Sequence, residues 1–299
     1  MNLRSVKKLM PWYSKPLLKI VLSKLPVHYS VWKRMGIFEH GFADDAAYSL
    51  RVFQSHFSVF QESGIGRPFV GLELGPGDSL SSAFLMHACG ASQSYLVDCA
   101  PCARTDPDGY YRLIDQFGEL GLNIRLPGSL TMNELLDAVN CRYLTNGLES
   151  LRGIPDQSVD FIWSQAVLEH LPAGEVPHFW REFSRILRPG GCCSHEVDLR
   201  DHFNMALNHL RFSPAFYESS TVRQAGFYVN RMSLTEHLNF IGEAGFSASV
   251  SDCRTWPKIP IERRRIHSAY RHFSDQDLHV SVFRVVCDLP KRAVGATSA

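Results

Sequence analysis

A glycine-containing turn between a strand pattern and a helix pattern constrains the fold of this chain more than any other feature. Phe69 to Leu74 is a short apolar run typical of a buried strand, and Gly75-Pro-Gly77 is a tight turn. Leu80 to Ala88 has a helical pattern that Gly90 ends. A second strand pattern, Ser94 to Asp98, follows at once. This order of strand, helix and strand predicts a parallel sheet with right-handed crossovers.

The same alternation continues along the chain. Further strands are predicted at residues 141–145, 159–163, 192–197, 247–253 and 278–287. Further helices are predicted over residues 133–139, over residues 179–187 up to Pro189-Gly190-Gly191, and from the capping box Ser233-x-x-Glu236 to Gly245. Seven strands predict one doubly wound α/β sheet rather than two domains. Residues 198–232 are too long for a simple connection, which is typical of an insertion that covers an active site.

The start of the chain is strongly basic. Eight of the 31 Lys and Arg residues precede Glu39, and no Asp or Glu lies among them. Residues 17–25 place their leucines and valine on one helical face, largely opposite the lysines. This pattern fits a helix docked on the domain, or a helix in residues 1–38 that contacts an anionic membrane surface. The rest of the chain is acidic, which disfavours a nucleic-acid partner.

We therefore divide the chain into an arm and a domain. The basic amphipathic arm spans residues 1–45, and the domain spans residues 46–299. Within the domain we distinguish a cofactor half (69–197), the insertion (198–232) and the C-terminal strands (233–290).

Composition and cysteine usage narrow the class of protein. No apolar run approaches the ~18 residues that span a bilayer, and lysines interrupt every candidate secretory segment near the N-terminus. The eight cysteines follow no disulfide framework, so we expect a cytoplasmic protein, peripheral to the inner face of the membrane if the arm binds lipid. Cys99-Ala-Pro-Cys102 has the form of a redox motif or half a zinc site. No second ligand pair has matching spacing, so we interpret it as chance and predict no metal.

The turn at residues 73–79 has the chemistry of a cofactor-binding loop. Glycines let the backbone approach a ligand, and a helix N-terminus offers free N–H groups. The NAD fingerprint requires a third glycine where Leu80 stands, which weakens a dehydrogenase interpretation. Glu73, two positions before the first glycine, suits a cationic or amine-bearing ligand. Asp98 ends the second strand, where an acid would accept both hydroxyls of a ribose.

These residues resemble the first motif of the class I S-adenosylmethionine-dependent methyltransferases. Glu73, Gly75 and Gly77 match it, and Ser79 replaces its last glycine. Residues 154–162, 165–170 and 185–191 are similar to three later segments of the family. The small-molecule methyltransferases of type 11 fit best, and residues 194–202 are similar to members associated with bacterial surface-glycan biosynthesis.

The resemblance implies a Rossmann-like sheet and an enzyme that uses S-adenosyl-L-methionine. The sulfonium methyl group would pass to a small-molecule acceptor, preferably a hydroxyl of a sugar or of a lipid-linked, anionic glycan precursor. A nicotinamide-dependent oxidoreductase and a non-catalytic cofactor-binding scaffold remain as alternatives. Asn146 would accept a hydrogen bond from the adenine amine, and Leu148 would pack on the ring. The cofactor-binding residues would be Glu73, Gly75, Gly77, Ser79, Asp98, Asn146, Leu148, Ser164 and Gln165.

The catalytic candidates lie at or just past the end of the fifth strand, the edge where open α/β sheets bind ligands. They are His195, Asp198 and His202, with Asp201 nearby. His195 would remove a proton from a hydroxyl acceptor, and Asp198 would orient its ring. Structural hydrogen bonds within the insertion, or a metal site of His and carboxylates, would use the same residues. His170 is interpreted as a loop-fixing residue rather than a base.

A basic cluster follows late in the chain: Arg254, Lys258 and Arg263 to Arg265. Such a cluster is usually a solvated face. The alternative is a site for an anionic acceptor, such as a sugar phosphate or a lipid diphosphate.

Overall fold

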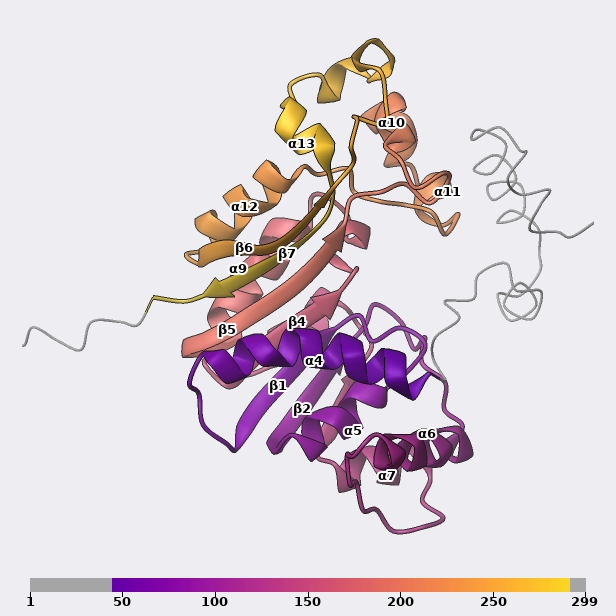
Figure 1. The fold of residues 1–299 in the computed structure, drawn as a ribbon, viewed down its shortest axis with the longest axis vertical. Coiled ribbons are helices and arrows are strands. Elements are labelled where there is room, and N and C mark those ends of the chain that lie inside the picture. The colour runs from indigo at the N-terminus through magenta and orange to yellow at the C-terminus, as the bar shows by residue number, and fades with distance from the viewer. Residues whose placement is uncertain (1–44, 291–299) are drawn as a thin grey trace, which may run out of the picture.

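A computed structural model describes residues 45–290, which form a seven-stranded sheet with helices on both faces (Figure 1). The strand order is β3-β2-β1-β4-β5-β7-β6. Strands β1 to β5 pair in parallel, and β7 is antiparallel to both β5 and β6. The predicted seven-stranded doubly wound α/β fold is confirmed. The strands are β1 (Phe69–Leu74), β2 (Ala91–Val97), β3 (Cys141–Leu144), β4 (Val159–Gln165), β5 (Leu187–Asp198), β6 (Ser247–Thr255) and β7 (Val280–Asp288).

Helices connect and cover these strands. The α-helices are α4 (Ala46–Glu62), α5 (Ser81–Ala88), α6 (Pro107–Glu119), α7 (Met132–Ala138), α8 (Leu148–Arg152), α9 (Val176–Ile186), α10 (Pro214–Tyr217), α11 (Ser220–Arg223), α12 (Leu234–Glu243) and α13 (Asp275–His279). The short 3-10 helices within residues 45–290 are η1 (Leu168–His170), η2 (Asn208–Arg211), η3 (Arg263–Arg265) and η4 (Ser268–Tyr270). The capping box predicted at Ser233 and Glu236 begins α12, as expected.

The sheet separates two hydrophobic cores. Figure 1 shows α4 in front of the sheet, and α9 and α12 behind it. Behind the sheet, Trp180 and Phe183 of α9 pack on the strands. In front, Phe57 and Phe60 of α4 pack on aromatic rings of β1 and β4. Because both faces are covered there, residues of the central strands β1 and β4 that point either way are withdrawn from solvent, whereas the edge strand β6 is exposed along its length.

The junction between α9 and β5 differs from the prediction. The helix ends at Ile186 and β5 begins at Leu187, whereas the sequence predicted a strand start at Cys192. The pairing of β4 with β5 shifts register between Val159 and Phe161, so this part of β5 is irregular. Pro189 is tolerated there because it lies at the irregularity, where the ladder does not need its missing N–H group.

The insertion at residues 198–232 does not cover the sheet edge alone. Phe203, Tyr217 and Phe227 give it a small core of its own. Another small core, separate from those on the sheet, joins Leu207 and Leu210 of the insertion to apolar residues between β6 and β7. These residues are Ile261, Ile266, Phe273 and Leu278. We call residues 198–232 and 256–279 together the cap. The cap stands where β5 and β6 end and β7 begins (Figure 1).

The amphipathic arm lies outside the described residues, except for Asp45, which caps α4. Its predicted contact with a membrane therefore remains a prediction. Within residues 45–290, none of the helices is both long and apolar enough to cross a bilayer.

Candidate cofactor and acceptor site

The loops that follow β1, β2 and β3 meet at the carboxyl edge of the sheet. The Gly75 N–H donates to the carbonyl of Val97 (2.7 Å), and the Gly77 N–H donates to Oδ2 of Asp98 (3.1 Å). The Gly147 N–H donates to the Asp98 carbonyl (2.8 Å). These bonds place the predicted glycine turn beside Asp98.

Both predicted glycines of the turn adopt backbone angles that favour glycine. Gly75 has a φ of +72°, and a Cβ there would lie 2.5 Å from Cγ2 of Val167. Gly77 has a φ of +63°, and a Cβ there would meet nothing within 4 Å. Gly75 is thus required by packing, whereas the space beside Gly77 is open to a ligand.

Glu73 lies at the end of β1, buried against α5, where the Ser82 hydroxyl donates to its Oε2. Burial raises the pKa of Glu73 to about 8, and the nearby Asp98 charge adds to this rise. At neutral pH the side chain is therefore mainly a neutral acid. A cation placed beside it would favour its ionised form.

Asp98 is nearly buried and holds two loops. Its Oδ1 accepts from the Cys99 N–H (2.7 Å), while its Oδ2 accepts from Gly77. An ionised carboxylate has about four acceptor positions, so these bonds leave room for further donors. That capacity fits the predicted role with a ribose diol.

Three other cofactor candidates lie around these loops. The Ser79 hydroxyl accepts from the Ser81 N–H (3.3 Å) at the start of α5. Asn146 is exposed next to Gly147, and Leu148 is half-buried against the core. Their contacts with adenine remain predictions.

Ser164 and Gln165 do not present free side chains to the loops. Ser164 is fully buried and its hydroxyl bonds to Nδ1 of His195 (2.7 Å). The Gln165 amide is held from both ends, by His56 of α4 (3.0 Å) and by Glu196 of β5 (2.7 Å). These contacts occupy both side chains, and the part of Ser164 and Gln165 in cofactor binding remains a prediction.

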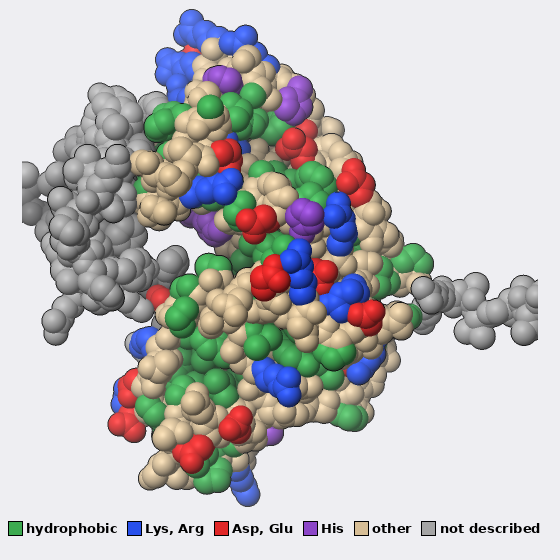
Figure 2. All heavy atoms as spheres, turned by 180° about the vertical axis from the view of Figure 1, so that it is seen from behind, with side chains coloured by type: hydrophobic (Ala, Val, Ile, Leu, Met, Phe, Trp, Pro, Cys, Tyr) green, Lys and Arg blue, Asp and Glu red, His purple; other side chains and the backbone are tan. Residues whose placement is uncertain are grey.

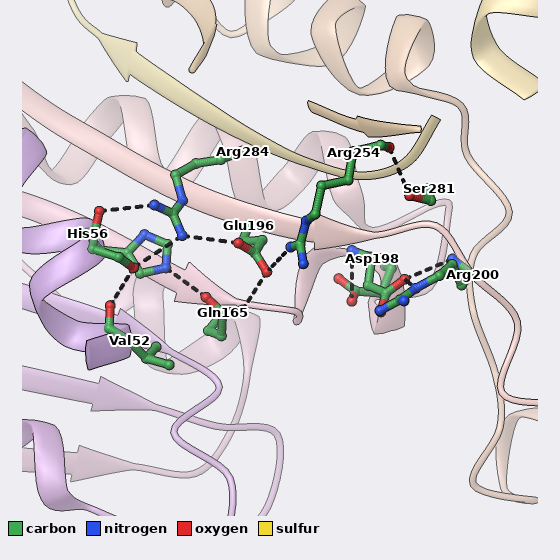
Figure 3. Close-up of polar contacts among 11 residues, drawn as sticks. Val52, His56, Gln165, Glu196, Asp198, Arg200, Arg254, Ser281 and Arg284 are labelled. Atoms are coloured by element: carbon green, nitrogen blue, oxygen red, sulfur yellow. Dashed lines mark hydrogen bonds and ion pairs between the residues drawn. The ribbon is translucent and has the colours of Figure 1, made fainter. Parts of the chain in front are cut away.

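Gln165 belongs to a polar network that sequence reasoning missed (Figure 3). Gln165 donates through its Nε2 to Glu196, so its Oε1 accepts from Nε2 of His56. Nδ1 of His56 then accepts from the Ser194 hydroxyl (2.8 Å). Burial lowers the pKa of His56 to about 4, so the ring is neutral with a fixed tautomer.

Glu196 is the charged centre of this network. It accepts from Arg284 of β7 (3.0 Å) and Arg254 of β6 (2.7 Å), which ties four strands to α4 (Figure 3). Burial alone would raise the pKa of Glu196, but the Gln165 hydrogen bond and the two guanidinium groups lower it overall. The network fixes the carboxyl ends of β4 and β5 relative to each other.

His195 is a core residue. It has no exposed surface, and its ring lies between Trp180 (5.2 Å between centroids) and Phe183 (5.5 Å) of α9. Burial lowers the pKa of His195 to about 3. This placement contradicts the expected general base, because the ring cannot reach an acceptor at the sheet edge. Its Nε2 has no hydrogen-bond partner among the described residues.

Asp198 does not orient His195. Its carboxylate is bound by Arg200, through Nε (2.8 Å) and Nη2 (2.6 Å). The Asp198 N–H donates to Glu169 of η1 (3.1 Å). Burial raises the pKa of Glu169 well above its usual value, so this side chain is a neutral acid. Asp198 therefore fixes the entry of the chain into the cap rather than serving His195.

His202 is the catalytic candidate that the structure leaves at the edge. It is exposed, and its ring stacks on that of His170 at 5.1 Å and 18°. Nδ1 of His170 donates to the Tyr228 carbonyl (2.8 Å), which is the loop-fixing contact expected of His170. Asp201 is fully buried and accepts from several groups of its own loop, among them the Asn208 N–H (2.6 Å).

All four arginines of the predicted basic cluster are paired with carboxylates. Arg254 binds Glu196, Arg263 binds Asp275, and Arg264 and Arg265 bind Glu262. Figure 2 shows Lys and Arg side chains gathered at the end of the molecule that carries the cap. An anionic acceptor there would compete with these ion pairs.

Within residues 45–290, no three His, Cys, Asp or Glu side chains are grouped so that they could hold a metal ion.

Comparison with known families gives one match, which covers residues 126–194 and is described as a methyltransferase domain. The matched segment runs from before α7 to the middle of β5. The match confirms the predicted enzyme class, a methyltransferase. No curated protein matches the chain.

Several solved structures resemble the chain at low identity. An S-adenosylmethionine-dependent methyltransferase from Mesorhizobium loti is 13% identical over 78% of this chain and 97% of its own, with a TM-score of 0.42. The YcgJ protein of Bacillus subtilis is 15% identical over 79% and 98%, with a TM-score of 0.44. A phosphoethanolamine N-methyltransferase of Haemonchus contortus is 15% identical over 79% and 52%, with a TM-score of 0.45.

Proposed function

We propose that this chain is an S-adenosyl-L-methionine-dependent methyltransferase with a small-molecule acceptor. The observation that carries the proposal is the meeting of three loops at Gly77, Asp98 and Gly147, the last of which lies in the segment that matches a methyltransferase domain. When bound, the cofactor supplies an electrophilic methyl group. The protein's part is to align the acceptor and exclude water.

The residues at this edge fit such a cofactor. The open space beside Gly77 leaves room for a ligand, and a side chain at this position would fill that space. Asp98 retains acceptor capacity for a diol, and Glu73 lies behind the turn as an acid that a cation would ionise. Asn146 and Leu148 flank the same loop on the β3 side and would contact the base.

The acceptor we favour is a hydroxyl of a sugar or of a lipid-linked glycan precursor. This choice rests on the resemblance of residues 194–202 to methyltransferases of surface-glycan biosynthesis. The stacked pair of His170 and His202 stands at the edge where an acceptor would enter. Because His195 is buried, a base for the hydroxyl proton would come from this pair.

Cofactor preference distinguishes the proposed methyltransferase from the alternative, a nicotinamide-dependent oxidoreductase. Calorimetric titration of the full chain with S-adenosylhomocysteine and, in parallel, with NADH should show binding of the first alone. Binding of NADH alone would refute the proposal. With binding established, transfer of a labelled methyl group to glycan extracts would separate an enzyme from a cofactor-binding scaffold.

A further inference from the structure

Two exposed cysteines next to the proposed cofactor loops have no role in the function proposed above. Cys99 directly follows Asp98, and Cys102 comes three residues later. Both thiols are free and exposed. Cys253 of β6 is also free and exposed, but it lies on an edge strand away from these loops.

The two thiols interact with each other. The side-chain interaction between them lowers the pKa of Cys99 and raises that of Cys102. A thiol with a lowered pKa forms more of the thiolate, which is the nucleophile in disulfide exchange. Cys99 is therefore the attacking thiol of the pair, and Cys102 is placed to resolve a mixed disulfide.

The turn that carries the pair is held in shape. The Cys102 N–H donates to the Ala100 carbonyl (2.8 Å) and to the Tyr143 hydroxyl of β3 (3.1 Å). The same hydroxyl accepts from the Ala103 N–H (3.3 Å) and donates to Ala100 (3.3 Å). Because one tyrosine fixes three backbone groups of the turn, the thiols are kept together.

The turn is joined to each cofactor loop. The Cys99 N–H donates to Asp98, the predicted ribose acceptor, at 2.7 Å. The Arg104 N–H donates to the Asp78 carbonyl in the glycine turn (3.1 Å). On the other side, a Cβ on Gly147 would lie 3.8 Å from Cα of Cys99. A change in the position of Cys99 therefore reaches all three loops.

We propose that Cys99 and Cys102 form a dithiol modification site that exchanges with low-molecular-weight disulfides, and that its oxidised form binds the cofactor more weakly. The second half of this statement rests on the proposed function. In the first step, the Cys99 thiolate attacks a sulfur of glutathione disulfide and releases one glutathione. In the second, the Cys102 thiolate attacks the Cys99 sulfur and releases the other. Two protein thiols are oxidised, and one glutathione disulfide is reduced to two glutathione molecules.

The effect on the cofactor follows from Asp98. Closing the disulfide ties Cys99 to Cys102 and moves the Cys99 N–H, one of two backbone donors that orient the Asp98 carboxylate. Loss of one such hydrogen bond corresponds to an affinity lower by about 2- to 12-fold.

The first test is chemical and does not depend on the cofactor. The full chain is incubated with glutathione disulfide, alkylated and mapped by mass spectrometry. We expect the peptide containing residues 99–102 to lose two hydrogens and to resist alkylation until dithiothreitol is added. In the Cys102→Ser variant the remaining Cys99 should instead retain glutathione. Cys253 serves as the internal control, and oxidation no faster at residues 99–102 than at Cys253 would overturn the proposed site.

The second test measures S-adenosylhomocysteine affinity of reduced and oxidised protein. We expect the oxidised wild type to bind about 2- to 12-fold more weakly, and the Cys253→Ser variant to behave in the same way. Dithiothreitol should restore the affinity. Equal affinities of the two forms would refute the link to the cofactor. Failure of the reduced protein to bind at all would refute the proposed function, while peptide mapping would still decide the dithiol site.

Discussion

Replacing Glu73 by glutamine should remove a specific pH dependence from the free energy of unfolding. Burial raises the pKa of Glu73 to about 8 in the folded chain, whereas an unfolded glutamate titrates near 4.5. Between these values the folded chain keeps the proton that the unfolded chain has lost. The contribution of Glu73 to the free energy of unfolding is therefore fully present below about pH 4.5 and is lost as pH rises towards 8.

The size of the effect follows from the pKa difference. Within the window from pH 5.5 to 7.5, each pH unit lowers the free energy of unfolding by up to ~1.4 kcal/mol, because one proton separates the two states. Over this window the wild type should lose about 2 kcal/mol through Glu73. Glutamine is neutral at every pH, so the Glu73→Gln variant should not show this loss.

The assay is urea denaturation of both proteins at pH 5.5, 6.5 and 7.5. The difference in unfolding free energy, variant minus wild type, should rise by about 2 kcal/mol across the series. Glu134→Gln is the control: Glu134 is exposed, and hydrogen bonds from Thr131 lower its pKa. Its difference from wild type should stay constant, because both of its pKa values lie below the window. Parallel curves for Glu73→Gln and wild type would refute the assignment of a neutral buried acid.

Four further outcomes are expected. Gly77→Val should abolish S-adenosylhomocysteine binding in calorimetry, whereas Gly64→Val, at a similarly open glycine of positive φ outside the cofactor loops, should leave it unchanged. Asp98→Ala should weaken that binding by about 1–3 kcal/mol, and wild-type affinity would contradict the ribose role. His195→Ala should lower the melting temperature, at a cost of about 2–4 kcal/mol, with near-normal turnover per folded molecule; a selective loss of turnover would restore it as a base. Deleting residues 1–38 should abolish salt-sensitive sedimentation with anionic liposomes, and equal sedimentation would favour a docked helix.

The fold could be predicted because its signals are local. Apolar runs located every strand, and the glycine turn and the capping box at Ser233 and Glu236 marked helix starts. The start of β5 was wrong because Pro189-Gly190-Gly191 has the composition of a turn, yet it lies within an irregular stretch of strand. The length of the insertion predicted a cover for the sheet edge. It gave no sign that residues 256–279 share its core.

The site could be predicted only where short local motifs carry its residues. Glu73, Gly77 and Asp98 lie in short motifs, and the structure brings them together. The surroundings of Gln165 and His195 could not be predicted because they come from distant residues. His56 meets Gln165 from 109 positions away, and Trp180 and Phe183 cover His195 from α9. A histidine in a strand sequence does not reveal which face of the sheet it occupies, since helices cover both.

The shared core of the cap limits how residues 198–232 of this chain can be exchanged with those of a relative. Leu207 and Leu210 pack against Ile261 and Phe273, and the His267 N–H donates to the Leu210 carbonyl (2.9 Å). A chimera that receives only residues 198–232 from a relative would contain one side of this packed core without the relative's residues that pack against it. Changes in the two segments would then be non-additive, because neighbouring groups compensate for each other. The cap should therefore evolve by paired substitutions in two separate stretches of the gene.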